Sequence, residues 1–213
     1  MNIGILGSGD VAKSLAAGLI SEGHSVMLGT RDINKLAEWQ RSSGMAKIGS
    51  FAETAQFGEV IVLAVRGSAA ANALKEAGAA NIHGKVILDT TNPIADAVPA
   101  NGVLKFFTDI NMSLMETLQS EFPQVRFVKA FNSVGNARMV HPRFTEGTPS
   151  MFICGNDDAA KKVATNLIHS LGWDVVDMGK VEAARAIEPL CMLWCILGFI
   201  NNEWTHAFKL LRK

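Results

Sequence analysis

A glycine-rich turn near the start of the chain constrains the fold more than any other feature. An apolar run, Asn2–Leu6, leads directly into Gly7–Ala12, whose spacing is G-x-G-x-x-A and after which a helical pattern begins. Gly7 permits a tight turn, Gly9 lets a pyrophosphate approach the backbone, and the small Ala12 lets helix and strand pack closely. The amides at such a helix start also attract phosphate. The predicted cofactor contacts in this turn are Gly7, Ser8, Gly9, Asp10 and Val11.

The rest of the chain alternates apolar runs with helical patterns, which is the order of βαβ units. The expected strands are Asn2–Leu6, His24–Gly29, Ala46–Ile48, Val60–Val65, Val86–Asp89, Val125–Ala130, Ser150–Cys154 and Asp174–Asp177. The expected helices are Asp10–Ser21, Asn34–Arg41, Ala69–Ala77, Met112–Ser120, Asp157–Ser170 and Val181–Leu211, the last kinked or divided at Pro189. We therefore predict an α/β fold: a Rossmann-type, doubly wound, mostly parallel sheet with a C-terminal helical segment. Residues 1–182 are expected to form the NADP-binding domain, and residues 183–213 a helical segment of the same domain.

The end of the second strand bears on which dinucleotide is bound. An acidic side chain there would bind the ribose hydroxyls of NAD, but the residue at that position is Thr30. Arg31 follows and Lys35 lies one helical turn further on, so a hydroxyl and two cations are available to the 2′-phosphate of NADP. Asp32 is expected to be the N-cap of the next helix. NADP(H) is the predicted cofactor, and the alternative is that both cations are solvated surface charges.

Three further strand ends should meet at the edge of the sheet where the cofactor lies, because ligands of parallel sheets bind at the carboxyl ends of the strands. Small, amide and hydroxyl side chains occupy these ends, and their backbone carbonyls are available to a nicotinamide amide. Val65, Asn92 and Asn132 are the preferred contacts. The neighbouring candidates are Ala64, Arg66, Pro93 and Ala130. The alternative role for each preferred contact is a local hydrogen bond within a turn.

The sequence indicates no catalytic side chain and no metal site. The five histidines form no close pair and none stands beside a carboxylate at ligand spacing. No serine-nucleophile elbow or paired-carboxylate motif is present. Hydride transfer between two rings depends on position and orientation more than on a proton-transfer group. His141 lies in a loop near the expected active edge and is the candidate acid or base, with a packing role as its alternative.

Composition excludes several classes of protein. The chain is 48% hydrophobic with a net charge of zero, which excludes a disordered chain and argues against a nucleic-acid partner. The apolar run Pro189–Ile200 is shorter than a membrane span, so no membrane partner is expected. Three cysteines without a disulfide framework and a start without an export signal predict a cytoplasmic protein.

Several of these motifs together resemble a known family. The run Gly7–Ala16, the segment Gly29–Asp32 and the tripeptide Thr91–Pro93 resemble the NADPH-dependent reductases of the deazaflavin coenzyme F420. They are equally similar to the cytosolic oxidoreductase domain of the STEAP metalloreductases. The stretches 128–132, 153–156 and 176–179 add to the resemblance, which extends to about residue 182.

The resemblance implies a chemistry. NADPH would lie along Ser8–Val11, Thr30, Arg31 and Lys35, with its nicotinamide near Val65, Arg66, Asn92 and Ala130, and would exchange hydride with F420 or a flavin. Two other functions stay open. One is an NADP(H)-binding redox sensor without turnover. The other is a reductase of imines or small carbonyls, which would need a proton donor such as His141 or Ser133.

The C-terminal segment predicts assembly. Apolar side chains surround most of the helix expected after Ala183, and a helix that is apolar all round must be buried. These residues are Ile187, Leu190, Met192, Leu193, Trp194, Ile196, Leu197, Phe199, Ile200, Trp204 and Phe208. A two-fold homodimer paired through this region is therefore expected. The alternative is that the segment packs wholly inside its own chain.

Overall fold

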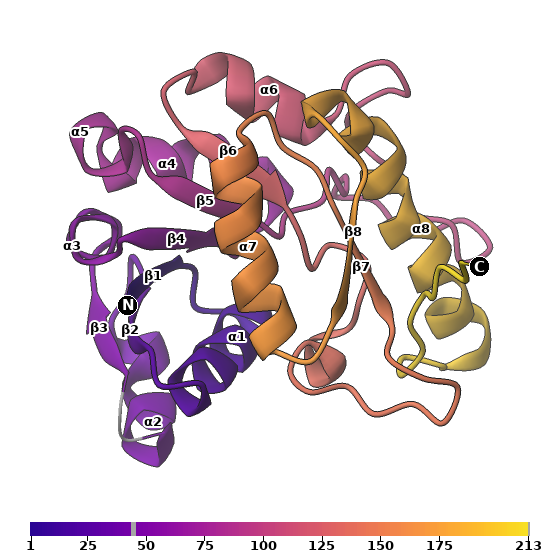
Figure 1. Ribbon diagram of the computed structural model, residues 1–213, viewed down its shortest axis with the longest axis horizontal. Coiled ribbons are helices and arrows are strands. Elements are labelled where there is room, and N and C mark those ends of the chain that lie inside the picture. Colours follow the sequence, from indigo (N-terminus) through magenta and orange to yellow (C-terminus); the bar gives the residue numbers. More distant parts are fainter. Residues whose placement is uncertain (44–45, 213) are drawn as a thin grey trace.

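The computed structural model describes residues 1–43 and 46–212 (Figure 1). Within these residues, a parallel sheet has the strand order β3-β2-β1-β4-β5-β6, and β7 and β8 form a separate parallel pair. The strands are β1 Asn2–Leu6, β2 Ser25–Gly29, β3 Lys47–Gly49, β4 Val60–Leu63, β5 Val86–Asp89, β6 Arg126–Lys129, β7 Ser150–Ile153 and β8 Asp174–Asp177. This order, with its reversal beside β1, confirms the Rossmann-type fold predicted from the alternating pattern.

Helices cover both faces of the six-stranded sheet. The α-helices are α1 Asp10–Ser21, α2 Asn34–Ser43, α3 Phe51–Phe57, α4 Ala70–Ala77, α5 Ala79–Ile82, α6 Leu114–Glu121, α7 Asp158–Ser170 and α8 Ala184–Asn201. Short 3₁₀ turns lie at Gly67–Ala69, Asn136–Arg138 and Val181–Ala183. In Figure 1, α1 and α7 lie on one side of the sheet and α3 to α6 on the other.

Alternation along single strands produces this double covering. In β4, Val60 and Val62 belong to the core shared with α1 and α7, whereas Ile61 and Leu63 belong to the core shared with α3, α4 and α6. A strand that is buried on both faces must be apolar at every position, and Val60–Leu63 is. The doubly wound architecture follows directly from such runs.

Strands β7 and β8 are not a simple continuation of the main sheet. The amide of Lys129 at the end of β6 donates to the carbonyl of Cys154, in an isolated antiparallel bridge. The sequence pattern predicted both strands but not this separation. The pair instead packs beneath α7, and Figure 1 shows both strands between α7 and α8.

Three helices differ from expectation, because α3 and the short α5 are additional to the predicted pattern and α8 ends earlier. Helix α3 was not predicted, although Ser50 and Glu53 form a capping box at its start, in which each side chain accepts the other residue's backbone amide. The expected helix 181–211 ends at Asn201, where Asn202 adopts a left-handed conformation with φ 54°. Trp204 then folds back onto Gly198, where an added Cβ would lie 2.3 Å from the indole. Helix α8 runs continuously through Pro189.

The expectation that the apolar C-terminal run is too short for a membrane span was wrong in its length. Within the described residues, the 21-residue helical stretch Val181–Asn201 is long and apolar enough to cross a bilayer. Such a helix is weak evidence for a membrane, because core helices pass the same test. Glu188 within it is buried against the sheet, so this stretch is part of the packed domain.

Candidate functional site

The glycine turn has the geometry that its spacing predicted. Gly7 has φ 146°, and an added Cβ would lie 2.1 Å from the carbonyl oxygen of Ala64. Only glycine fits at such a close approach. Gly9 is the N-cap of α1 and faces open space, with no atom within 4 Å of a built Cβ. Because the first amides of a helix lack intrahelical partners, this turn presents free donors to an anion.

Two cavities meet at this turn. The smaller, the Arg31 cavity, has a volume of about 290 Å³ and lies between the turn, the end of β2 and α4. The larger, the Asn92 cavity, has a volume of about 750 Å³ and extends past the ends of β4 and β5 to the loop that carries Phe107. The residues that line both are Gly9, Ala64, Val65 and Arg66. A single elongated ligand can therefore cross from one cavity to the other over Gly9.

Most predicted contacts line one of these cavities. The Arg31 cavity brings together Gly7, Ser8, Gly9, Thr30, Arg31, Lys35, Ala64, Val65 and Arg66. The Asn92 cavity adds Asp10, Val11 and Asn92. Three predicted contacts, Pro93, Ala130 and Asn132, are buried and line neither cavity. Cofactor contact by any of these residues stays a prediction.

The end of β2 is built to present Arg31. The Thr30 hydroxyl donates to the carbonyl of Asp32 at 3.0 Å and accepts the Asp32 amide at 3.1 Å. The Asp32 carboxylate accepts the amide of Asn34, the first residue of α2, at 3.0 Å, although Ile33 rather than Asp32 directly precedes that helix. Thr30 is thus occupied within its own turn. Arg31 and Lys35 are exposed and form no ion pair with any described residue, so both cations are free to meet a phosphate.

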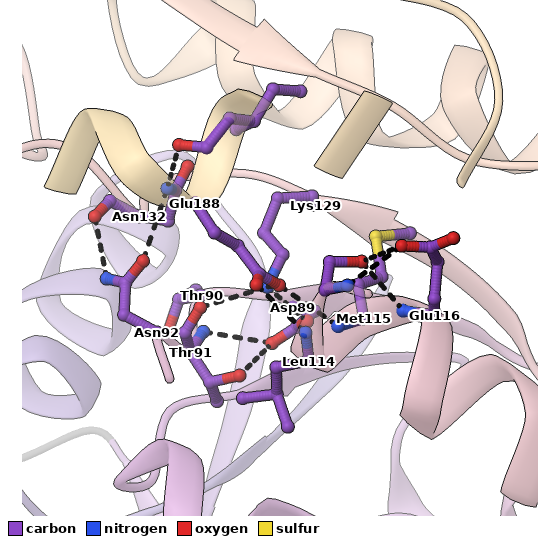
Figure 2. A network of polar contacts seen from close by, with 12 residues as sticks. Asp89, Thr90, Thr91, Asn92, Leu114, Met115, Glu116, Lys129, Asn132 and Glu188 are labelled. Atoms are coloured by element: carbon purple, nitrogen blue, oxygen red, sulfur yellow. Dashed lines mark hydrogen bonds and ion pairs between the residues drawn. The ribbon is translucent and has the colours of Figure 1, made fainter. Parts of the chain in front are cut away.

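A buried ion cluster, shown in Figure 2, contacts Thr91, which lines the Asn92 cavity. The Lys129 ammonium at the end of β6 lies 2.6 Å from Asp89 Oδ2 and 2.9 Å from Glu188 Oε1, and donates to the carbonyl of Thr91 at 2.9 Å. All three charged side chains are at most 2% exposed. Burial lowers the pKa of Lys129, but its pairing with Asp89 and Glu188 outweighs burial and raises that pKa above the usual lysine value.

The same cluster joins three separate elements. Glu188 on α8 also accepts the amides of Leu114 and Met115, at 2.9 and 3.0 Å, so its carboxylate caps the N-terminus of α6. Asp89 Oδ1 accepts both the amide and the hydroxyl of Thr91, a residue that lines the Asn92 cavity. The buried charges of Asp89 and Lys129 therefore hold Thr91, and with it this part of the cavity wall, in place.

Sequence reasoning missed this cluster. A lysine inside the apolar run Val125–Ala130 was a usable signal, because a charge in a buried strand needs a partner. The partners, Asp89 and Glu188, lie far away in the sequence and no local spacing links them to Lys129.

The two candidate proton donors lie elsewhere. His141 Nε2 contacts Glu22 Oε1 at 2.9 Å near the end of α1, and His141 lines neither cavity. Ser133 is buried and likewise lines neither cavity. Among the residues described, no group of three or more His, Cys, Asp or Glu side chains is arranged to hold a metal ion.

Comparison with known proteins agrees with this geometry. The family model described as "NADP oxidoreductase coenzyme F420-dependent" matches residues 2–93. A crystal structure assigned to the F420-dependent NADP reductases, from Arthrobacter sp. FB24, superposes with a TM-score of 0.92 at 34% identity, over 99% of each chain. The chain belongs to this family. The resemblance inferred from the glycine turn and the later motifs is thereby confirmed.

Two curated relatives extend the picture of the family. The F420-dependent NADP reductase of Methanocaldococcus jannaschii is 26% identical over 91% of this chain and 90% of its own length. The rat metalloreductase STEAP3 is 32% identical over 88% of this chain, which spans 36% of that protein. The family fold therefore occurs both as a whole chain and as about a third of a longer protein.

Proposed function

We propose that this chain is an NADP(H)-dependent oxidoreductase that transfers hydride between the nicotinamide and a flavin-like acceptor, either deazaflavin F420 or a flavin. The observation that carries the proposal is the pair of cavities that meet over Gly9, with free cations in one and amide and hydroxyl groups in the other. Family membership supports NADP as the cofactor.

The two cavities divide the dinucleotide between them. Arg31 and Lys35 would hold the adenosine 2′-phosphate in the Arg31 cavity, and the amides at the start of α1 would hold the pyrophosphate. The nicotinamide would then be held in the Asn92 cavity. That cavity is of the size that binds a complete small ligand, so it has room for an acceptor ring beside the nicotinamide.

Position accounts for the chemistry. Bound NADPH would supply a hydride, with both bonding electrons, to the acceptor ring and would become NADP⁺, and any proton that the acceptor needs would come from water. Such a transfer between two rings requires no protein acid or base. The protein's contribution is to hold two rings in contact and to limit competing water.

Turnover with a panel of acceptors tests the proposal. Purified protein is mixed with NADPH and F420, FMN or FAD, and the nicotinamide absorbance is followed. Consumption of NADPH that depends on both protein and acceptor is expected, with NADH a poor substitute. Tight NADPH binding without turnover of any acceptor would instead favour a redox sensor, and turnover only with imines or carbonyls would favour the third function.

We also propose that the chain pairs as a homodimer through α8. The support is the exposed apolar face of that helix, on which Leu193, Leu197, Phe199 and Ile200 are between 39 and 61% exposed. Trp194 is instead buried against Trp204 and His206, so it belongs to the fold and not to this face. Light scattering should give twice the 22.8 kDa chain mass, and Ile200→Glu should halve it; an unchanged single-chain mass for both would contradict pairing.

The free cysteines support a reducing compartment for this activity. Cys154, Cys191 and Cys195 form no disulfide, and the first two are buried. Unpaired cysteines are the usual state in the cytoplasm, which is where we place the protein.

A further inference from the structure

Asn92 has a fixed amide orientation at the wall of its cavity. Its side-chain Nδ2 donates to the backbone carbonyl of Asn132 at 2.7 Å, and its Oδ1 accepts from Asn132 Nδ2 at 3.3 Å (Figure 2). An amide flipped by half a turn would face its oxygen toward a carbonyl and its nitrogen toward a donor, so both contacts would fail. The reciprocal pair therefore selects one of the two orientations.

Asn132 is itself held from behind. It is only 4% exposed, and its Nδ2 also donates to the carbonyl of Ile187 on α8 at 2.8 Å. Ile187 is next to Glu188, whose carboxylate is paired with Lys129. Asn132 thus links the buried part of α8 at Ile187 and Glu188 to a side chain at the cavity wall, although Asn132 itself does not line the cavity.

The pair leaves Asn92 with hydrogen-bonding capacity. An asparagine amide has two donors and two acceptor lone pairs, and one of each is used here. One donor and one acceptor therefore remain on a half-buried side chain in the cavity wall. This set is complementary to a primary carboxamide, which presents one oxygen acceptor and N–H donors, and which is the substituent of the nicotinamide ring.

We infer that Asn92 binds the nicotinamide carboxamide and that Asn132 is a positioning residue that keeps the Asn92 amide in the orientation required. The inference rests on the proposed function, because it assumes that the nicotinamide enters the Asn92 cavity. It assigns a binding role to Asn92 and, in place of the direct contact predicted from the sequence, an indirect role to Asn132, which lines neither cavity.

Two ligands separate this role from a structural one. NADPH carries the nicotinamide, whereas adenosine 2′,5′-bisphosphate carries the 2′-phosphate end alone. Asn132→Asp keeps the side-chain shape and removes the amide donor to Asn92 and Ile187. The dissociation constant of NADPH, measured by calorimetry, should rise about two- to tenfold, as expected for one hydrogen bond. The dissociation constant of the bisphosphate should stay unchanged.

Asn81→Asp is the matched control. Asn81 Nδ2 also donates to a backbone carbonyl, that of Ala77 at 2.8 Å, but Asn81 lies outside both cavities. It should leave both dissociation constants at wild-type values. Equal weakening of both ligands by Asn132→Asp, or of neither, would overturn the inference.

A double variant tests whether Asn132 acts through Asn92. Asn92→Ala combined with Asn132→Asp should bind NADPH no more weakly than Asn92→Ala alone, because the residue being positioned is already absent. Additive losses would show that Asn132 acts by itself and would overturn the inference. The inference would also be overturned if wild-type protein bound NADPH no more tightly than the bisphosphate. If wild-type protein bound neither ligand, the proposed function itself would be rejected.

Discussion

Two cations at strand ends of this sheet, Arg31 and Lys129, have different environments and different roles. Arg31, after β2, is exposed and unpaired among the described residues, and it lines a cavity. Lys129, at the end of β6, is fully buried between two carboxylates and lines neither cavity. Arg31 is therefore available to a ligand, whereas Lys129 is already paired with Asp89 and Glu188 inside the fold.

The two cations differ because Lys129 has its counter-charges within the protein, whereas Arg31 would receive one only from a bound ligand. A solvated cation keeps most of its hydration until a phosphate arrives, so the folded protein gains little from it. A buried cation has lost its water and depends on Asp89 and Glu188, and removal of Lys129 leaves both carboxylates unpaired. Stability should therefore depend on Lys129 and binding on Arg31.

Lys129→Met should have the largest effect. It leaves two buried carboxylates without a counter-charge, and breaking a buried pair in this way costs about 3–5 kcal/mol. Urea titration should show that much loss in the free energy of unfolding. Neutralising the carboxylates as well, with Asp89→Asn and Glu188→Gln, should recover part of it. A variant as stable as wild type would show that the cluster contributes no net stability.

Arg31→Ala should leave stability unchanged and reduce NADPH affinity. A charge-assisted contact with phosphate contributes about 1.5–3 kcal/mol, so the dissociation constant should rise about ten- to a hundredfold. NADH, which lacks the 2′-phosphate, should bind as before. Equal weakening of both cofactors would assign Arg31 to the fold and remove the contrast with Lys129.

The smallest effect concerns pH and the thiol beside the cluster. Burial raises the pKa of Cys154 from 9.0 to about 12. The folded thiol therefore keeps its proton where the unfolded thiol loses it. This contribution to stability is complete below pH 9 and is lost as the pH rises toward 12.

Between pH 8 and 10 this loss should be roughly 1–1.5 kcal/mol. Cys154→Ala should flatten the pH dependence of unfolding by that amount. The raised pKa of Lys129 acts later, because its stabilisation is complete below the unfolded lysine value of 10.5 and is lost as the pH rises from there through the folded value. The chain has no tyrosine, so no phenol titrates in this window. If Cys154→Ala and wild type showed the same change in unfolding free energy between pH 8 and 10, the raised pKa of Cys154 would be contradicted.

The comparison also explains what the sequence could predict. The turn at Gly7 and the cations Arg31 and Lys35 lie within continuous stretches, where spacing alone implies geometry. The sheet and the α1, α4 and α7 helices followed from hydrophobic periodicity. The capping box of Ser50 and Glu53 was a local signal for α3 that the short apolar pattern did not bring out.

The ion cluster and the amide pair could not be predicted in the same way. Each contact joins residues about 40 or more positions apart, as between Asn92 and Asn132, and depends on how α8 packs after the sheet has formed. Asn92 and Asn132 were each selected as possible cofactor contacts, but nothing local indicated that they contact each other. Tertiary packing, rather than propensity, decides such pairs.

Because Glu188 is synthesised long after α6, the contacts of its carboxylate with the first amides of α6 cannot form until late in synthesis. Leu114 and its carboxylate partner are separated by 74 residues. At about 5–20 residues per second, the ribosome needs roughly 4–15 seconds to make that span. During this interval the N-terminus of α6 is capped only by its own Ser113 and Glu116, and Lys129 lacks one of its two carboxylate partners. A translational pause before α8 emerges would prolong the time in which chaperones, rather than the protein's own last helix, must cover this edge.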